Sequence, residues 1–290
     1  MFEKLAKIIY VFLKILDLPF KVLFKKSFLI WFKDLIEKDA NYLIEVSKKN
    51  LKICLFNPSY LTNWLYEDFL TKEPETIQWI DNFDKEKDIV FWDIGANLGL
   101  YSIYAALNFE KIKIISFEPS TSNLRILSRN IYLNNLQHKI KIIQLPLGNK
   151  EMSFSDFRES IFEEGASNNA FDDRINFEGR SFNEKNSYQI LGTTANYILK
   201  NNITAIPDYV KIDVDGLEHN ILIGFFNYLK HPKIKKIQIE LNENFEEQKK
   251  MVFEILLKNN FKYKSKKRNE NLSIYKIKKF NKIYNYYFEK

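Results

Sequence analysis

The sequence contains a single cysteine, Cys54, in 290 residues. One cysteine excludes a disulfide framework and a metal site built from several thiolates, and it fits a reducing compartment, so the expected location is the cytoplasm. Only eight glycines and seven prolines are present, which excludes a low-complexity chain. Hydrophobic residues make up 46% and aromatic residues 16%, which is ample for a buried core.

Long apolar runs are also missing from the N-terminal region. The longest one there, Ile8–Leu13, is far shorter than the about 20 residues of a membrane-spanning helix, and no small-residue cleavage site of a secretory signal follows it. Residues 1–26 carry six lysines against two acidic residues. We expect residues 1–32 to pack on the main domain or on a partner subunit; the alternative is an interfacial helix on the anionic inner face of a membrane.

The formal net charge of +7 points to anionic partners, since basic residues concentrate at both ends of the chain. No recognisable nucleic-acid-binding module accompanies this charge, so nucleic acid is not an expected partner. The length suits one large domain with an appendage. We expect a helical, basic and apolar N-terminal region at residues 1–78 and a main domain at residues 79–290.

The most informative stretch begins with Ile89–Trp92, an apolar run that predicts a strand buried on both faces. Asp93 follows, and Gly95 and Gly99 then allow a tight turn in which backbone can approach a ligand. Apolar residues at helical spacing over Leu100–Leu107 predict that this turn opens a helix. Strand, glycine turn and helix start together form a nucleotide-binding corner.

The spacing of this corner differs from a dinucleotide fingerprint, because Asn97 stands where the middle glycine would be. A second predicted strand, Ile112–Phe117, ends in Glu118, which can accept hydrogen bonds from both ribose hydroxyls of a nucleoside. A nucleoside without phosphate therefore fits best, and S-adenosylmethionine is the leading candidate. An oxidoreductase that uses NAD is disfavoured by the missing glycine.

Three motifs carry a resemblance to a known family: DIGANLGLYS at residues 93–102, FEPS at 117–120 and KIDVDGLE at 211–218. Together they resemble the FkbM-type S-adenosylmethionine-dependent methyltransferases over roughly residues 79–240. The resemblance implies methyl transfer to a hydroxyl of a sugar or sugar-derived acceptor, as in surface polysaccharide synthesis. The predicted cofactor-binding residues are Asp93, Gly95, Asn97, Gly99, Tyr101, Glu118, Gln144 and Leu145.

Strands and helices alternate from residue 89 onward, which predicts a doubly wound, mostly parallel α/β sheet. With the family resemblance this becomes a seven-stranded, Rossmann-like class I methyltransferase domain with an α-helical N-terminal appendage. A hairpin of Phe261–Lys264 and Leu272–Ile277 would close the sheet, and residues 278–290 would form a packing or surface segment. Before the domain we predict helix over Leu35–Ser47 and a short strand at Lys52–Phe56.

A second acidic corner follows the predicted strand Tyr209–Ile212, beside the first strand at the topological switch point. Asp213 would lie near the transferable methyl group and orient or deprotonate the acceptor hydroxyl. Glu218 and His219 are the other candidate catalytic residues, although a surface position early in a helix explains His219 equally well.

The irregular stretch at about residues 151–192 predicts a hairpin or loop over the site. Ser167 and Asn168 are its candidate contacts to the acceptor or the cofactor, and Glu240 would hold acceptor hydroxyls. Asp213, Asp215, Glu218 and Glu240 form a weaker alternative, a Mg²⁺ site; we expect no metal. An RNA methyltransferase and a non-catalytic interaction protein stay open as alternative functions.

Overall fold

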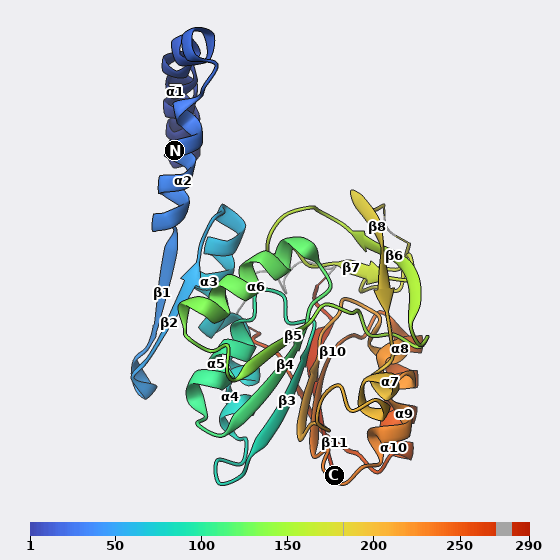
Figure 1. Ribbon diagram of the computed structural model, residues 1–290. Helices are drawn as coiled ribbons and strands as arrows, with labels where there is room; N and C mark the ends of the chain where they lie inside the picture. Colours follow the sequence, from blue (N-terminus) through green and yellow to red (C-terminus); the bar gives the residue numbers. More distant parts are fainter. Residues whose placement is uncertain (182, 271–279) are drawn as a thin grey trace.

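The computed structural model describes residues 1–181, 183–270 and 280–290. Its centre is a seven-stranded sheet in the order β11-β12-β10-β9-β3-β4-β5, with parallel pairing from β10 to β5 and antiparallel pairing of β12 with both neighbours (Figure 1). The strands are β3 (Ile89–Ile94), β4 (Ile112–Phe117), β5 (Ile140–Ile143), β9 (Tyr209–Ile212), β10 (Lys236–Asn242), β11 (Lys262–Lys267) and β12 (Ile283–Glu289). The predicted doubly wound, mostly parallel sheet is confirmed.

Helices cover both faces of this sheet, and successive residues of β3 supply a core on each face. Phe91 belongs to the core under one set of helices and Trp92 to the core on the opposite face. The first set comprises α3 (Tyr60–Lys72), α4 (Pro74–Asp81), α5 (Leu100–Asn108) and α6 (Thr121–Leu133). The second comprises α7 (Ala195–Lys200), α8 (Glu218–Ile223), α9 (Phe226–Leu229) and α10 (Glu246–Lys258).

The N-terminal region contains α1 (Phe2–Phe24), α2 (Phe28–Asp39), the antiparallel strands β1 (Asn41–Val46) and β2 (Leu51–Phe56), and the short 3-10 helix η1 (Ser47–Lys49) between them. The prediction of helix through Leu35–Ser47 is therefore wrong beyond Asp39, because Asn41–Val46 pairs with β2. The predicted boundary at residues 78 and 79 lies inside α4.

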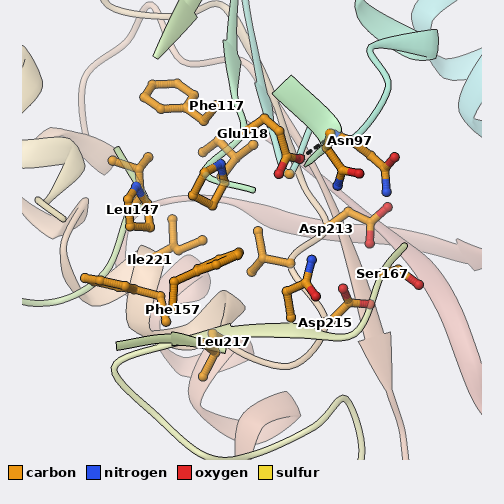
Figure 2. Close-up of a pocket in the computed structure, with 18 of the residues that line it drawn as sticks. Asn97, Phe117, Glu118, Leu147, Phe157, Ser167, Asp213, Asp215, Leu217 and Ile221 are labelled. Carbon is orange, nitrogen blue, oxygen red and sulfur yellow. Dashed lines mark hydrogen bonds between the residues drawn. The ribbon is translucent and has the colours of Figure 1, made fainter. Parts of the chain in front are cut away.

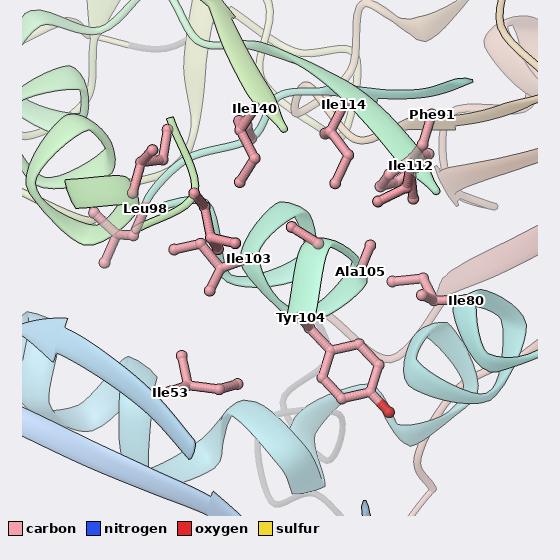
Figure 3. Close-up of a cluster of buried hydrophobic side chains, with 14 of the residues drawn as sticks. Ile53, Ile80, Phe91, Leu98, Ile103, Tyr104, Ala105, Ile112, Ile114 and Ile140 are labelled. Atoms are coloured by element: carbon pink, nitrogen blue, oxygen red, sulfur yellow. The ribbon is translucent and has the colours of Figure 1, made fainter. Parts of the chain in front are cut away.

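The β1–β2 ribbon joins the main domain through α6 and α5. Ile53 of β2 lies in the same buried cluster as Ile103 and Ala105 of α5, and Figure 3 shows α5 between this ribbon and the isoleucines of the sheet. Asn134 of α6 accepts a hydrogen bond from the Cys54 backbone N–H at 3.0 Å and donates one to the Cys54 carbonyl. The ribbon thus packs against one side of the main domain.

Asn130 makes the most buried of these contacts, which leads to a stability prediction. Its Oδ1 accepts from the Phe56 N–H at 2.7 Å, and its Nδ2 donates to the Leu98 carbonyl at 3.0 Å. Asn130→Ala leaves both backbone groups buried without partners, at about 1–3 kcal/mol each. We expect the free energy of unfolding, measured with urea, to fall by about 2–6 kcal/mol. Ser128→Ala, at an exposed position of α6, is the control and should change it by less than about 0.5 kcal/mol.

The irregular insertion forms a three-stranded antiparallel sheet in the order β7-β6-β8, with β6 (Ser153–Glu159), β7 (Asn169–Phe171) and β8 (Asn186–Gly192). This agrees with the predicted hairpin, enlarged by one short strand. Phe157 of β6 and Phe171 of β7 contribute to the wall of a cavity at the end of the main sheet. The insertion therefore helps to build the candidate site.

The C-terminal end of the chain differs from the prediction. The predicted second hairpin strand, Leu272–Ile277, lies outside the described residues. β11 pairs with β12, which lies between β11 and β10. Within the tail expected to be a packing or surface segment, Ile283–Glu289 forms a sheet strand, and its residues Tyr286 and Phe288 are buried. The strand was not predicted because lysine and asparagine residues flank this stretch, although its aromatic residues favour a strand.

Candidate active site

Two adjoining cavities lie where β3, β4 and β9 end. The first has a volume of about 620 Å³ and the second about 880 Å³, and both volumes include space that is open to solvent. Both are lined by Gly95, Asn97, Ser167, Asp213 and Asp215, so these residues form the boundary between them. The carboxyl ends of parallel strands are where open α/β sheets bind ligands, and the position of both cavities follows this rule.

The first cavity is mostly apolar on one side and polar on the other. Figure 2 shows Phe117, Leu147, Phe157 and Ile221 gathered opposite Glu118 and the boundary residues. Such a wall suits a flat heteroaromatic ring, and the polar side suits hydroxyl groups. The arrangement fits a nucleoside with its base on the apolar side.

Glu118 lies at the end of β4 and is 5% exposed. Its Oε2 accepts a hydrogen bond from the Asn97 N–H at 2.7 Å (Figure 2). Its Oε1 accepts one from the Ser120 N–H at 2.9 Å. Burial raises the pKa of Glu118 to about 7, against the lowering effect of these two backbone donors. Each carboxylate oxygen still has a lone pair for a ligand hydroxyl.

Gly95 allows β3 and β9 to end side by side under the cavities. Its φ is +81°, and a Cβ at this position would lie 1.9 Å from the backbone oxygen of Asp213. Any other residue would push apart the loops that follow the two strands. The predicted need for glycine is therefore explained by contact between two loops, each of which carries residues of the boundary.

The second cavity collects charged groups. Glu73, Asp213 and Glu240 each place a carboxylate oxygen so that the three lie within 4.8 Å of one another. Lys72 and Lys211 also line this cavity. Burial, reinforced by the negative charges of Asp213 and Glu73, raises the pKa of Glu240 well above its ordinary value. Glu240 therefore retains a proton more readily than an exposed glutamate.

Lys211 holds this group of acids in place. Its Nζ lies 2.8 Å from Asp213 Oδ2 and 5.0 Å from the centre of the Tyr101 ring. Burial opposes its charge, but Asp213, Asp93 and Glu73 outweigh burial and raise the pKa of Lys211. Lys211 thus stays an ammonium ion beside Asp213. Tyr101 completes the set, because its hydroxyl donates to Glu73 Oε2 at 2.9 Å.

Several predicted cofactor residues lie behind the cavity walls. Asp93 is 1% exposed and accepts a hydrogen bond from Ser102 Oγ at 2.7 Å, so it acts on the site through the charge of Lys211. Gly99 precedes α5 and packs against Leu127. The residues after β5 that line the first cavity are Pro146 and Leu147 rather than the predicted Gln144 and Leu145. Tyr101 lines the second cavity.

The other two predicted catalytic residues, Glu218 and His219, lie in α8. Glu218 is buried and accepts hydrogen bonds from the Val214 and Gly216 N–H groups and from Gln248, so it fixes the loop after β9. His219 packs edge-on against Phe245, with ring centres 5.9 Å apart. Neither is among the described residues that line either cavity. Of the three candidates, Asp213 alone lies at both.

The insertion contributes one of its two predicted contacts. Ser167 lines both cavities. Asn168 is a neighbour of the lining, and its backbone N–H donates to Asp215 Oδ2 at 2.6 Å. This bond ties the insertion to the loop after β9. Burial, together with the charge of Asp213, raises the pKa of Asp215 to about 6.

Lys72 and Glu73, at the junction of α3 and α4, were not predicted from the sequence. Glu73 is 3% exposed, although it stands in a run of charged residues that predicts a solvated surface. Its only local signal is the following Pro74, which begins α4 and sets the direction of the chain. The acidic set that the structure assembles is Glu73, Asp213 and Glu240, with Asp215 at its border.

Comparison with known proteins agrees with this geometry. The family model described as Methyltransferase FkbM domain matches residues 93–263. The methyltransferase sdnD from Sordaria araneosa is 32% identical over 88 residues, which are 30% of this chain and 34% of that protein. The chain thus spans about a third of the length of this curated relative.

Solved structures share the fold. A Streptococcus mutans protein, provisionally assigned as a SAM-dependent methyltransferase, is 10% identical with a TM-score of 0.50, over 87% of this chain and 56% of that one. Methyltransferase FkbM from Methylobacillus flagellatus is 16% identical with a TM-score of 0.44, over 79% and 55% of the respective chains. At such identities the similarity extends to the fold alone.

Proposed function

The chain belongs to the FkbM methyltransferase family, and on that premise we propose that it methylates a hydroxyl oxygen of a sugar or sugar-derived acceptor. Its cofactor is S-adenosylmethionine. The observation that carries the proposal is the second cavity. Its charged side chains can form hydrogen bonds with an acceptor, and it adjoins the first cavity, which fits a nucleoside. Surface polysaccharide synthesis in the cytoplasm is the setting that we propose for this reaction.

The first cavity fits the adenosine part of the cofactor. Glu118 would accept hydrogen bonds from the ribose hydroxyls, and Leu147 and Phe157 would flank the adenine ring. Asn97 and Gly95, at the boundary, would lie toward the methionine part. The bound cofactor would supply a methyl group on its sulfonium sulfur; an oxygen nucleophile in line with the carbon–sulfur bond would displace S-adenosylhomocysteine as the leaving group.

Asp213 is the residue best placed to act on the acceptor hydroxyl, because it lines both cavities. Its carboxylate would accept the proton that the hydroxyl loses, and the Lys211 ammonium orients it through a 2.8 Å contact. A positioned base of this kind contributes roughly 10²–10⁴-fold to a rate. Enclosure by the insertion and by α3 keeps the reacting groups aligned and limits access of water.

The charges of the second cavity favour a polyhydroxylated acceptor. Glu73 and Glu240 provide hydrogen-bond acceptors, and Lys72 provides donors. A phosphate-rich ligand such as RNA would meet three acidic groups here, which disfavours the RNA methyltransferase alternative in spite of the positive net charge.

A transfer assay tests this proposal directly. S-adenosylmethionine with a labelled methyl group would be offered with monosaccharides, nucleotide sugars and oligosaccharides, and in parallel with total RNA. We expect label in a carbohydrate product as a methyl ether, and loss of that label in Asp213→Asn. Label in RNA, or on a nitrogen of an amino sugar, would contradict the proposal.

We also expect the reaction to need no divalent cation. Lys72 and Lys211 already face the three acids that would bind a cation, Glu73, Asp213 and Glu240. The Lys211 ammonium donates a hydrogen bond to Asp213. The predicted result is an unchanged transfer rate after dialysis against EDTA, within about twofold. A loss of rate that Mg²⁺ restores would reverse this expectation and assign the three acids to a metal.

A further inference from the structure

We propose that the hairpin of α1 and α2 binds the surface of a membrane that contains anionic lipids. This proposal does not depend on the acceptor. Figure 1 shows the two helices standing clear of the catalytic domain, beyond the end of the sheet at which the parallel strands finish. They are joined to the domain through the β1–β2 ribbon. The expectation that residues 1–32 pack on the main domain is therefore wrong.

The hairpin exposes large apolar side chains along its whole length. Ile8 is 67% exposed, Leu23 73% and Trp31 72%. Asp17 is the one buried residue of the 23 in α1, and α2 has none among its 12. Soluble proteins rarely expose so large an apolar surface to water, so this hairpin is expected to bind another protein or a membrane.

Charged residues define how the hairpin would lie. Glu3, Lys7, Lys14, Asp17 and Lys21 follow one another at spacings of three, four or seven residues, so they form one stripe along α1. The rest of the helix circumference is mainly apolar. A broad apolar face beside a narrow, lysine-containing stripe is typical of a helix that lies in a membrane interface.

The turn between the helices is structured rather than loose. Asp17 accepts hydrogen bonds from Ser27 Oγ at 2.6 Å and from the Phe28 N–H at 2.8 Å, and Phe20 packs edge-on against Phe28. These contacts close the hairpin with a polar bond at its turn and leave the apolar sides facing outward. Lys25 and Lys26 lie at the turn and are exposed.

The charge of the hairpin fits an anionic lipid surface. Residues 1–38 contain eight lysines and four acidic residues. Basic residues near an anionic bilayer contribute about 1 kcal/mol each. No described helix is long and apolar enough to cross a membrane, so insertion parallel to the surface is the form of binding that fits α1. Its 23 residues extend about 34 Å.

Ion pairs connect the base of the hairpin to α6. Glu37 of α2 pairs with Arg125 and Arg129 of α6, and α6 begins beside Glu118. The hairpin and the carboxyl ends of the sheet strands are thus on the same side of the molecule (Figure 1). Membrane binding would therefore turn the side of the molecule that carries the site toward the bilayer.

A second copy of the chain is the competing occupant. A helix that pairs in a coiled coil has an apolar seam of two positions in seven. In α1 the apolar residues cover most of the circumference, including the consecutive run from Ile8 to Leu13. A lipid surface accepts this breadth, whereas a two-helix seam would leave much of it in water.

Vesicle flotation with the full chain tests the proposal. Neutral phosphatidylcholine vesicles would be compared with vesicles that also contain about 30% phosphatidylglycerol. We expect flotation with the anionic vesicles, weakening at high salt. Ile8→Glu with Ile15→Glu should lower the bound fraction at least about tenfold. The matched control is Ile203→Glu with Leu257→Glu, two exposed apolar residues of the catalytic domain, and it should float like the unmodified chain.

Two measurements keep the result interpretable. Titration with S-adenosylmethionine shows that each variant is folded, because its binding site lies in the catalytic domain. Sedimentation gives the oligomeric state without lipid. A folded chain that does not float, or that forms a defined oligomer disrupted by Ile8→Glu with Ile15→Glu, would overturn the proposal in favour of a second copy. Equal flotation with neutral vesicles would overturn the requirement for anionic lipid.

Discussion

Asp213→Asn is expected to lower the rate constant for methyl transfer by roughly 10²–10⁴-fold while cofactor affinity changes by less than about threefold. The substitution keeps the shape of the side chain and removes its ability to accept a proton. Asp213 borders both cavities, and its carboxylate is the group that Lys211 orients. The measurement is single-turnover transfer to the acceptor found by the labelled-methyl screen, with calorimetric titration of S-adenosylmethionine alongside.

Two further variants separate chemistry from electrostatics. Glu240 lines only the second cavity. The substitution Glu240→Gln should therefore weaken acceptor binding more than it slows methyl transfer. Asp172→Asn, in an ion pair with Lys150 outside the lining of both cavities, controls for loss of an acidic charge and should leave the rate unchanged. A rate for Asp213→Asn within about threefold of the original would show that positioning alone drives the reaction and that Asp213 is not the base.

The sequence predicted the parts of the site that lie directly after buried strands. Asn97, Glu118 and Asp213 each follow an apolar run within a few residues, and the parallel sheet brings these run ends together. Strand pattern, glycine turn and acidic residue are local signals. They also fixed the order of β3, β4 and β9, because a nucleotide-binding corner leaves few alternative topologies.

Contacts between distant segments could not be predicted in this way. Glu73 joins the second cavity because α3 and α4 pack over α5, and this packing has no motif of its own. Glu218 carries the same local signal as Asp213, an acid near a strand end. The backbone of the loop after β9 turns it inward to accept the Val214 and Gly216 N–H groups. Distinguishing the two required the conformation of the loop.

The N-terminal region shows a related difficulty. Residues 35–47 mix helix-forming and strand-forming residues, and the local pattern favoured continued helix. Pairing with β2 decides the outcome, because register from Asn41 to Val46 places Ile44 in the core of the domain. The hairpin before it differs: its apolar content predicted packing on the main domain or on a partner subunit, and within the single chain it is exposed.

Glu118→Ala is expected to weaken S-adenosylmethionine binding by about 100-fold or more. A hydrogen bond to a buried charged group contributes about 1.5–3 kcal/mol, and a tenfold change in affinity corresponds to about 1.4 kcal/mol. If the Glu118 carboxylate accepts hydrogen bonds from two ribose hydroxyls, its removal should lower the affinity by more than about 100-fold. Calorimetric titration with S-adenosylmethionine and S-adenosylhomocysteine measures the change. Glu151→Ala, at an exposed position, is the matched control and should bind like the unmodified chain.

The same carboxyl group predicts a pH dependence that identifies its role. Burial raises the pKa of Glu118 to about 7. Below this pH the group is protonated and loses acceptor capacity, so affinity should fall as the pH decreases from 8 to 6. Bound hydroxyls favour the ionised form, so the apparent pKa should be lower in the complex. Glu118→Gln cannot ionise and should bind weakly with a flatter profile, in which Asp215, with its own pKa raised to about 6, still contributes. Equal slopes in both proteins would place the titrating group elsewhere and remove Glu118 from the ribose site.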